Sequence, residues 1–191
     1  QVTLRAAPLP DEPTAGHTVQ RIHLNADFVD PTLLRSALSY TLFPRLGVDA
    51  PRWRHVLPTV SGEPAGLYVG LESVDRDFCL RRGWPPGPIF YAINRNANFG
   101  LISPFTRTLK EPLDRGYHPV EGADTEPIRQ MLLDLNLADD GSFLQAAARW
   151  FDLERYVHWV IGAVFVGNCD GFVHNYALYL EPGERRFRII P

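Results

Sequence analysis

Alternating and helical patterns divide the chain into a strand-rich first half and a helix-rich last third. Residues 2–5 and 19–24 alternate apolar and polar side chains, as half-buried strands do. Residues 52–60 and 66–74 repeat this pattern on either side of Ser61-Gly62-Glu63-Pro64, whose residue types favour a turn. These two runs therefore predict an antiparallel hairpin.

A helix is predicted between the first strands and this hairpin, over residues 30–46. Asp30 and Pro31 are residue types preferred at the N-cap and at the first helical position, and Pro44 and Gly47 predict an end near Leu46. Its apolar positions recur at helical spacing and predict one inward face. This face contains Leu33, Leu34, Ala37, Leu38, Thr41 and Leu42.

The segments around and after the hairpin are less regular. Residues 7–16 contain three prolines and a glycine and predict a loop, whereas residues 75–82 predict a short helix. Residues 89–93 predict a third strand of the hairpin's sheet. Residues 94–124 are polar and show no periodicity, and long stretches of this kind are usually functional or mobile.

Three helices are predicted in the last third. Thr125 and Ser142 are expected to cap the first two, the second ending near Trp150, and Asp152 is expected to cap a third over residues 153–166. This third helix is apolar on nearly every side, which predicts that it is buried.

Composition narrows the classes of protein. A chain of 191 residues suits one domain, and 45% hydrophobic with 21% charged residues is typical of a folded globular protein. The net charge of −3 gives no electrostatic basis for nucleic-acid binding. Cys79 and Cys169 show neither a disulfide framework nor zinc-site spacing, and no apolar run has the length of a membrane span. Both ends read as interrupted strands, so we expect a truncated domain.

Asp170 and Asn175 form the candidate chemical centre. They stand five residues apart on a glycine-containing loop between the apolar helix and a final hairpin. This is the spacing of the protein-kinase catalytic loop, in which the Asp receives the proton of the substrate hydroxyl and the Asn holds a metal ion. The structural alternative for Asp170 is an Asp that stabilises a turn next to Gly171.

The order of the elements is similar to that of a protein kinase downstream of its glycine-rich loop. A strand, a helix and two strands lead to residues 71–75, which occupy the place of the kinase hinge, against which adenine packs. A helical region, a buried helix, the Asp170 loop and a hairpin follow. The predicted helix after Asp30 contains no acidic residue that could pair with a kinase lysine.

Three ordered motifs resemble the spore-coat protein H (CotH) kinase family across nearly the whole chain. The first is Leu24-Asn25-Ala26-Asp27 leading into Asp30-Pro31-Thr32-Leu33-Leu34-Arg35. The second runs from Gly66-Leu67-Tyr68 through Glu72 to Asp75-Arg76-Asp77-Phe78. The third runs from Gly167-Asn168-Cys169-Asp170 through His174 to Asn175-Tyr176-Ala177-Leu178-Tyr179.

The resemblance implies an α+β, protein-kinase-like, two-lobed fold in one domain, with an antiparallel sheet lobe followed by a helical lobe. Residues 1–93 would form the sheet-rich lobe with one helix, residues 94–124 a long loop or insertion, and residues 125–191 the helical lobe with the catalytic loop and terminal hairpin. The family is atypical and secreted or surface-associated, with an extracellular, cell-surface or periplasmic place. It uses ATP and a divalent metal to phosphorylate proteins.

The resemblance also implies site residues. Asp170 would be the catalytic base, and Asn175 would bind Mg²⁺ or Mn²⁺ through its amide oxygen. Glu72 would lie near the adenine pocket, as a substitute partner for an upstream lysine or as a ligand of adenine through water. A salt bridge to Arg35 or Arg52 is its structural alternative. Arg35 would reach the ATP phosphates or, alternatively, be solvated at the surface.

Two departures from the family pattern limit the expectation. In the family the strand after the catalytic loop runs into Pro-Trp-Asp-x-Asp, which supplies a metal-binding Asp; its Trp-Asp-x-Asp part would follow Pro191, and the phosphate-contacting lysine would precede Gln1. The chain by itself is therefore predicted to be inactive even if its parent is a protein Ser/Thr kinase. The alternatives are a catalytically inactive kinase-like binding or surface-interaction module, and a small-molecule or sugar phosphotransferase.

Overall fold

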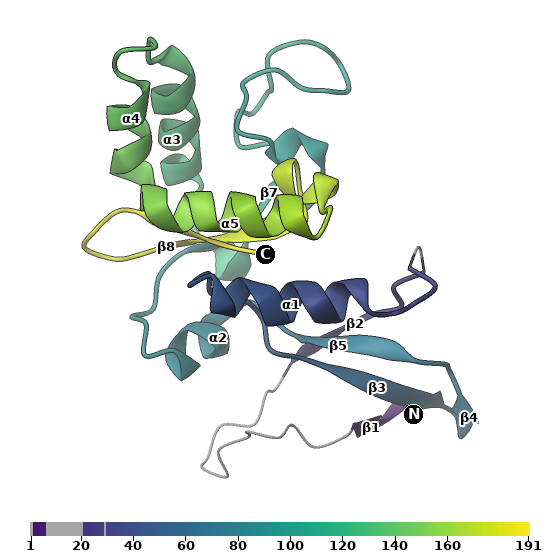
Figure 1. The fold of residues 1–191 in the computed structure, drawn as a ribbon. Coiled ribbons are helices and arrows are strands. Elements are labelled where there is room, and N and C mark those ends of the chain that lie inside the picture. The colour runs from purple at the N-terminus through teal and green to yellow at the C-terminus, as the bar shows by residue number, and fades with distance from the viewer. Residues whose placement is uncertain (1, 7–20, 29) are drawn as a thin grey trace.

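The computed structural model describes residues 2–6, 21–28 and 30–191, and these residues form an α+β architecture (Figure 1). Two antiparallel sheets are present, and helices α1 and α5 lie between the first sheet and the upper helical part of the molecule. The predicted α+β class is thus confirmed. The predicted loop over residues 7–16 and the start of the predicted strand at residue 19 lie outside the described residues.

The first sheet contains the predicted hairpin. Its strand order is β1 (Val2–Ala6), β3 (Trp53–Val60), β5 (Tyr68–Glu72) and β2 (Ile22–Asn25), and β4 (Glu63–Pro64) extends the hairpin beside β3. All pairings are antiparallel. Ser61 and Gly62 both have positive φ angles, of 52° and 91°, which is the backbone requirement of a tight hairpin turn. Hence the conformation of the two turn residues determines where the hairpin reverses its direction.

Helix α1 (Arg35–Arg45) starts later than the sequence predicts. The Asp30 carboxylate accepts hydrogen bonds from the N–H groups of Thr32, Leu34 and Arg35 at 3.1, 3.1 and 2.7 Å. These bonds hold the turn that precedes the helix, so Asp30 is not the residue directly before the first helical turn. Leu33 has a φ of 55°, in the left-handed region, so helical geometry cannot extend back to Pro31. The predicted start was wrong, whereas the predicted end near Leu46 is confirmed.

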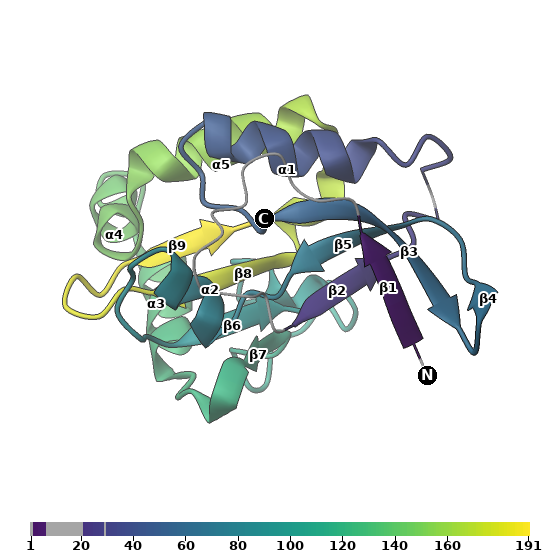
Figure 2. The ribbon, with the colours of Figure 1, turned by 90° about the horizontal axis from the view of Figure 1, so that it is seen from below.

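The second sheet joins segments that are distant in sequence. Its order is β7 (Tyr117–Pro119), β6 (Ile89–Ala92), β8 (Tyr176–Leu180) and β9 (Phe187–Ile190), all antiparallel (Figure 2). The prediction that residues 89–93 extend the hairpin's sheet was therefore wrong. Ile89, Phe90 and Ala92 are each at most 3% exposed, and the strand reaches this burial only between β7 and β8. The short helix α2 (Arg76–Arg81), capped by Asp75, precedes this strand as predicted.

Three helices complete the core against this sheet. They are α3 (Glu126–Leu137), α4 (Phe143–Trp150) and α5 (Leu153–Phe165). Asp152 caps α5 as predicted, accepting from the N–H groups of Glu154 and Arg155. Thr125 does not cap α3 through its side chain; Asp124 accepts from the N–H of Glu126 instead. Among the described residues, no helix has the length and apolar character needed to cross a bilayer.

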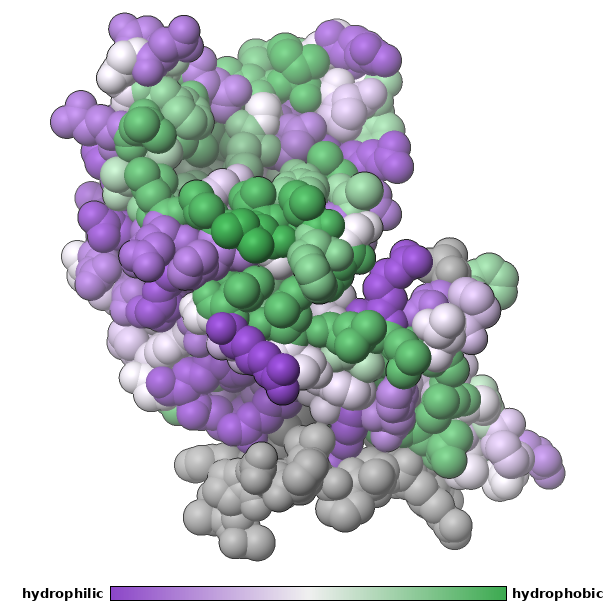
Figure 3. All heavy atoms as spheres, in the orientation of Figure 1, coloured by the Kyte–Doolittle hydropathy of each residue, from purple (hydrophilic) through white to green (hydrophobic). Residues whose placement is uncertain are grey.

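Helix α5 is not buried on all sides, contrary to the prediction. Trp159, Gly162 and Ala163 face the core, but four large apolar side chains on the other side are 50–80% exposed. Together with two exposed leucines, one at the N-cap of α1 and one within it, they form an apolar ridge, which Figure 3 shows as neighbouring green spheres over α5 and α1. The ridge consists of Leu34, Leu38, Val157, Ile161, Val164 and Phe165.

The segment 94–124 has little regular structure, but hydrogen bonds from a buried lysine hold parts of it together. Besides β7 it contains two 3-10 turns, η1 (Arg95–Ala97) and η2 (Val120–Gly122). The ammonium group of Lys110 is buried and donates to the carbonyl oxygens of Asn96 and Asn98 at 3.0 and 3.1 Å. Burial lowers the pKa of Lys110 to about 8, although the charge of Asp114 acts in the opposite direction. The segment is therefore packed around its lysine.

Replacing Gly162 by alanine is expected to destabilise the packing of α5 on α1. An added Cβ would lie 2.6 Å from Cε1 of Phe43 and 3.1 Å from Cδ1 of Leu46, and Phe43 is only 1% exposed. The clash should lower the free energy of unfolding by about 1–3 kcal/mol, in spite of the better helix propensity of alanine. Urea unfolding measures the change, with the exposed Val164→Ala as control. A Gly162→Ala protein at least as stable as the wild type would contradict this close packing.

Candidate functional site

A cleft of about 850 Å³ lies between the first sheet with α1 and the second sheet with the end of α5, and it brings the predicted site residues together. Arg35 comes from the first position of α1 and Glu72 from the last position of β5. Asp170 lies in the 3-10 turn η3 (Cys169–Phe172), and Asn175 directly precedes β8. All four line this cleft, although up to 140 residues separate them in sequence.

The loop around Asp170 is organised by its own backbone. Oδ1 of Asn168 accepts from the N–H of Gly171 at 3.0 Å, and the carbonyl oxygen of Asp170 accepts from the N–H groups of Val173 and His174 at 3.0 and 2.9 Å. Nδ1 of His174 also lies 3.1 Å from this carbonyl oxygen. The carboxylate of Asp170 is exposed and has no hydrogen bond or ion pair with the described residues. Its oxygens are therefore available to a ligand in the cleft.

Asn175 is held by its backbone alone. Its N–H donates to the carbonyl oxygen of Ala92 at 2.9 Å, which continues the pairing of β8 with β6, and its φ of 61° is left-handed. Asn tolerates this conformation better than most residues. The side chain is exposed and makes no hydrogen bond with the part of the chain that the structure describes. The amide oxygen is thus free beside the cleft.

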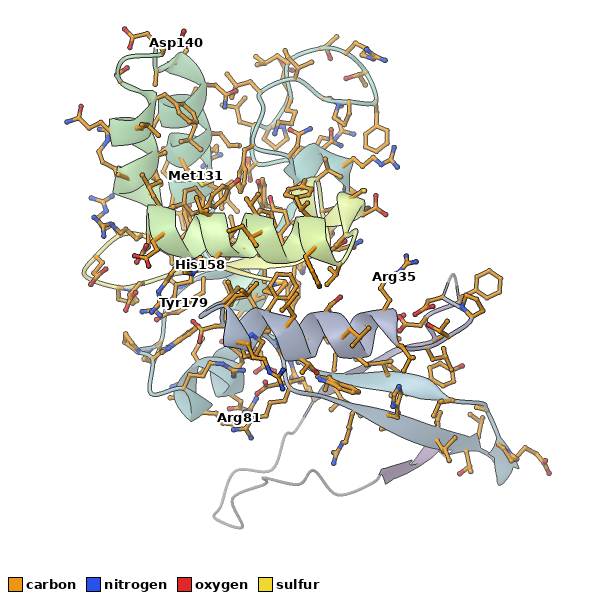
Figure 4. All side chains as sticks on the ribbon, in the orientation of Figure 1. Arg35, Arg81, Met131, Asp140, His158 and Tyr179 are labelled. Atoms are coloured by element: carbon orange, nitrogen blue, oxygen red, sulfur yellow. The ribbon has the colours of Figure 1, made fainter. Side chains whose placement is uncertain are left out.

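Arg35 extends from the start of α1 away from the first sheet, toward the end of α5 (Figure 4). Its guanidinium group forms no ion pair within the described ranges, and the side chain lies in the cleft wall. A planar guanidinium with all its donors free is suited to phosphate oxygens.

Glu72 is engaged by two arginines. Its Oε1 lies 2.6 Å from Nη2 of Arg81, and its Oε2 lies 3.1 Å from Nη2 of Arg82. Oε2 also accepts from the backbone N–H of Arg52 at 3.0 Å. Burial alone would raise the pKa of Glu72, but these hydrogen bonds and the charge of Arg82 hold it below 4.5. The predicted salt bridge exists with Arg81 and Arg82 in place of Arg35 or Arg52, and the adenine role of Glu72 stays a prediction.

The turn between β2 and α1 contributes two carboxylates to which the sequence pattern assigns no role in the site. Asp30 is buried, and hydrogen bonds from the side chain of Thr32 and the N–H of Arg35 lower its pKa to about 2. Asp27 is also buried, at 8% exposure, and lines the same cleft. Two short polar residues at the end of a strand and just after it, Asn25 and Asp27, are the signal that would have pointed to this turn.

The cleft fits a metal ion only if the ion takes part of its ligands from a bound molecule. Within residues 2–6, 21–28 and 30–191, no three His, Cys, Asp or Glu side chains are grouped as a metal site. Mg²⁺ commonly uses one or two carboxylates together with substrate phosphates and water. The free amide oxygen of Asn175 supplies a ligand of this hard type, and the free carboxylate of Asp170 lines the same cleft.

Comparison with known proteins identifies the family. The model of the CotH kinase protein family matches residues 6–191. Inner spore coat protein H of Bacillus subtilis is 35% identical over 182 residues, which cover 94% of this chain and 50% of that protein. An inner spore coat protein H-like protein of the same organism is 21% identical over 175 residues, covering 86% and 47%. The chain spans about half the length of the curated relatives it matches, and it belongs to the CotH kinase protein family.

Proposed function

We propose that the protein containing this chain transfers the γ-phosphoryl group of ATP to serine or threonine side chains of a protein substrate, in a kinase-like two-lobed fold. One observation carries the proposal: Asp170, Asn175, Arg35 and Glu72, selected by motif and family pattern, line a single cleft. In this arrangement the first sheet with α1 forms one lobe and the helical part with η3 forms the other. ATP, with Mg²⁺ or Mn²⁺, would lie between them.

Each residue has a role that its surroundings permit. The exposed carboxylate of Asp170 accepts the proton of the attacking hydroxyl group, and the amide oxygen of Asn175 holds the metal. Arg35 binds phosphate oxygens through its free guanidinium group. Leu71, Val74 and Ala177 supply apolar surface in the cleft wall for the adenine ring, and the Glu72 ion pairs hold the neighbouring strand end. Bound Mg²⁺–ATP supplies the transferable phosphoryl group and neutralises its charge.

The relatives suggest where the protein acts. Both carry the name inner spore coat protein H or a derivative of it. By analogy, we place this protein at a spore coat or comparable surface, with a coat protein as its acceptor. Since the chain covers half of each relative, residues elsewhere in the full-length protein are expected to complete the site, including a lysine and a second metal-binding carboxylate.

The test is phosphate transfer from labelled ATP by the full-length protein, with and without Mg²⁺ or Mn²⁺, followed by identification of the labelled product. Metal-dependent labelling of Ser or Thr in protein supports the proposal. Labelling of a sugar or another small molecule instead would identify a small-molecule phosphotransferase. Nucleotide binding without transfer to any acceptor would identify an inactive kinase-like module.

The second candidate function, a binding or surface-interaction module, has one observation in its favour. The apolar ridge exposes six large apolar side chains on adjoining parts of α1 and α5. Contiguous exposed apolar surface of this kind marks interaction sites in soluble proteins. None of the six ridge residues lines the cleft, so the ridge is compatible with both functions.

A further inference from the structure

The Asp27 carboxylate is buried in the cleft wall with only one of its two oxygens satisfied. Oδ1 accepts from Nδ2 of Asn25 at 2.7 Å and from the hydroxyl group of Ser36 at 2.8 Å. Oδ2 is buried and has no donor among the protein groups of the described residues. The residue also has a φ of 45°, a left-handed conformation in which few residues other than glycine, asparagine and aspartate are found.

This arrangement is costly in the absence of a ligand. A buried polar oxygen without a partner costs about 1–3 kcal/mol, and more when it is charged. Strained backbone at such a position is commonly found at ligand sites. No cationic side chain of the described residues forms an ion pair with Asp27, and Arg35, on the same cleft wall, also has no ion-pair partner there. Among the described residues, the Asp27 carboxylate therefore lines the cleft without a cationic partner.

The neighbouring groups are arranged around this carboxylate. Tyr40 lines the same cavity, and its pKa is raised to about 12, first by its burial and then by the negative charge of Asp27. Asn25 and Ser36 fix the orientation of the carboxylate by bonding its other oxygen. Groups that orient a ligating side chain in this way are typical of the surroundings of metal ligands.

We propose that Oδ2 of Asp27 binds a divalent cation, Mg²⁺ or Mn²⁺, that enters the cleft with the phosphates of the nucleotide. This inference rests on the proposed function, but it assigns a cation to the α1 wall, opposite the loop of Asp170 and Asn175. A divalent ion suits a site with a single carboxylate, because phosphate oxygens and water complete its coordination. Oδ2 is buried when no ligand is bound, so binding of the cation includes a small rotation of the Asp27 side chain that exposes this oxygen to the cleft.

The test counts ions by electron paramagnetic resonance, using Mn²⁺ and a non-hydrolysable ATP analogue with the full-length protein. The wild type is expected to bind two Mn²⁺ ions per nucleotide and Asp27→Asn only one. Ser36→Ala, which removes one of the groups that orient the carboxylate, should keep two ions and weaken one of them about tenfold. Asp49→Asn is the matched control, since this partly buried carboxylate pairs with Arg155 and Arg188 outside the cleft and should leave both ions unchanged.

The outcomes separate this inference from the proposed function. The inference is overturned if Asp27→Asn binds two ions with wild-type affinities. It is also overturned if the wild type binds a single ion and Asp27→Asn retains it. Both results leave the proposed function standing. If the wild-type protein fails to bind the nucleotide with Mg²⁺, with Mn²⁺ and without metal, both the inference and the proposed function are overturned. Thermal unfolding of each variant without nucleotide shows whether the protein is folded. If Asp27→Asn is unfolded, the count in Ser36→Ala decides, and unchanged affinity for both ions there overturns the inference.

Discussion

Replacing Asp170 by asparagine in the full-length protein is expected to lower the rate of phosphate transfer from ATP by about 10²- to 10⁴-fold, the usual contribution of a positioned general base. Asparagine has nearly the same shape but does not accept the proton of the attacking hydroxyl group. The loop should persist, because its hydrogen bonds use the backbone of Asp170 and the side chain of Asn168. The loss should therefore appear in kcat, with nucleotide affinity changed little.

Steady-state transfer of labelled phosphate and an independent nucleotide-binding measurement check this prediction. The matched control is Asp140→Asn, since Asp140 is an exposed carboxylate at the turn between α3 and α4 that does not line the cleft and lies far from Arg35 in Figure 4. It should transfer phosphate at the wild-type rate. If Asp170→Asn also kept that rate, Asp170 would be only a turn residue beside Gly171, and the catalytic assignment would have to be abandoned.

The second large effect is expected at Glu72. Glu72→Gln removes the negative charge between Arg81 and Arg82, whose side chains are only 7% and 17% exposed. Leaving two largely buried guanidinium groups without their counter-charge should lower the free energy of unfolding by about 3–5 kcal/mol. Because these pairs connect the end of β5 to α2, the variant should also weaken nucleotide binding at the neighbouring cleft wall.

The pH dependence of stability gives an independent check on Glu72. Its pKa in the folded protein lies below the reference value of 4.5, so the charged form stabilises the fold above pH 4.5. This contribution is lost as the pH falls below 4.5 and through the folded-state pKa. Urea unfolding at several pH values should therefore show a steeper acid loss for the wild type than for Glu72→Gln. Glu63→Gln, at an exposed position of β4, is the control, and equal acid profiles for all three proteins would refute the role of the ion pairs.

Local signals in the sequence were reliable where a few neighbouring residues decide the conformation. Ser61-Gly62 fixed a hairpin turn because both residues adopt positive φ angles. Asp75 and Asp152 marked the starts of α2 and α5, because a carboxylate satisfies free N–H groups of the first helical turn. At Asp30 the same signal failed by four residues, since Leu33 leaves helical geometry.

Local signals of this kind do not predict which distant strands pair or which side chains are buried. The apolar pattern of β6 shows that the strand is buried, but the same pattern fits either sheet, and only its pairing with β8 decides between them. Likewise, the apolar residues of α5 show a strong drive toward burial without showing what covers them. In the structure one side meets Phe43 and the core, and the other forms part of the apolar ridge.

The candidate site divides in the same way. By itself the sequence determined the α+β class, the family motifs, and Asp170 and Asn175 as a pair at kinase spacing, because these properties lie within short stretches of chain. Only the tertiary structure decided that Glu72 pairs with Arg81 and Arg82, and that Asp27 faces the cleft with an unsatisfied oxygen. The physical reason is that hydrogen-bond partners and burial depend on contacts between segments distant in sequence, which periodicity and spacing do not encode.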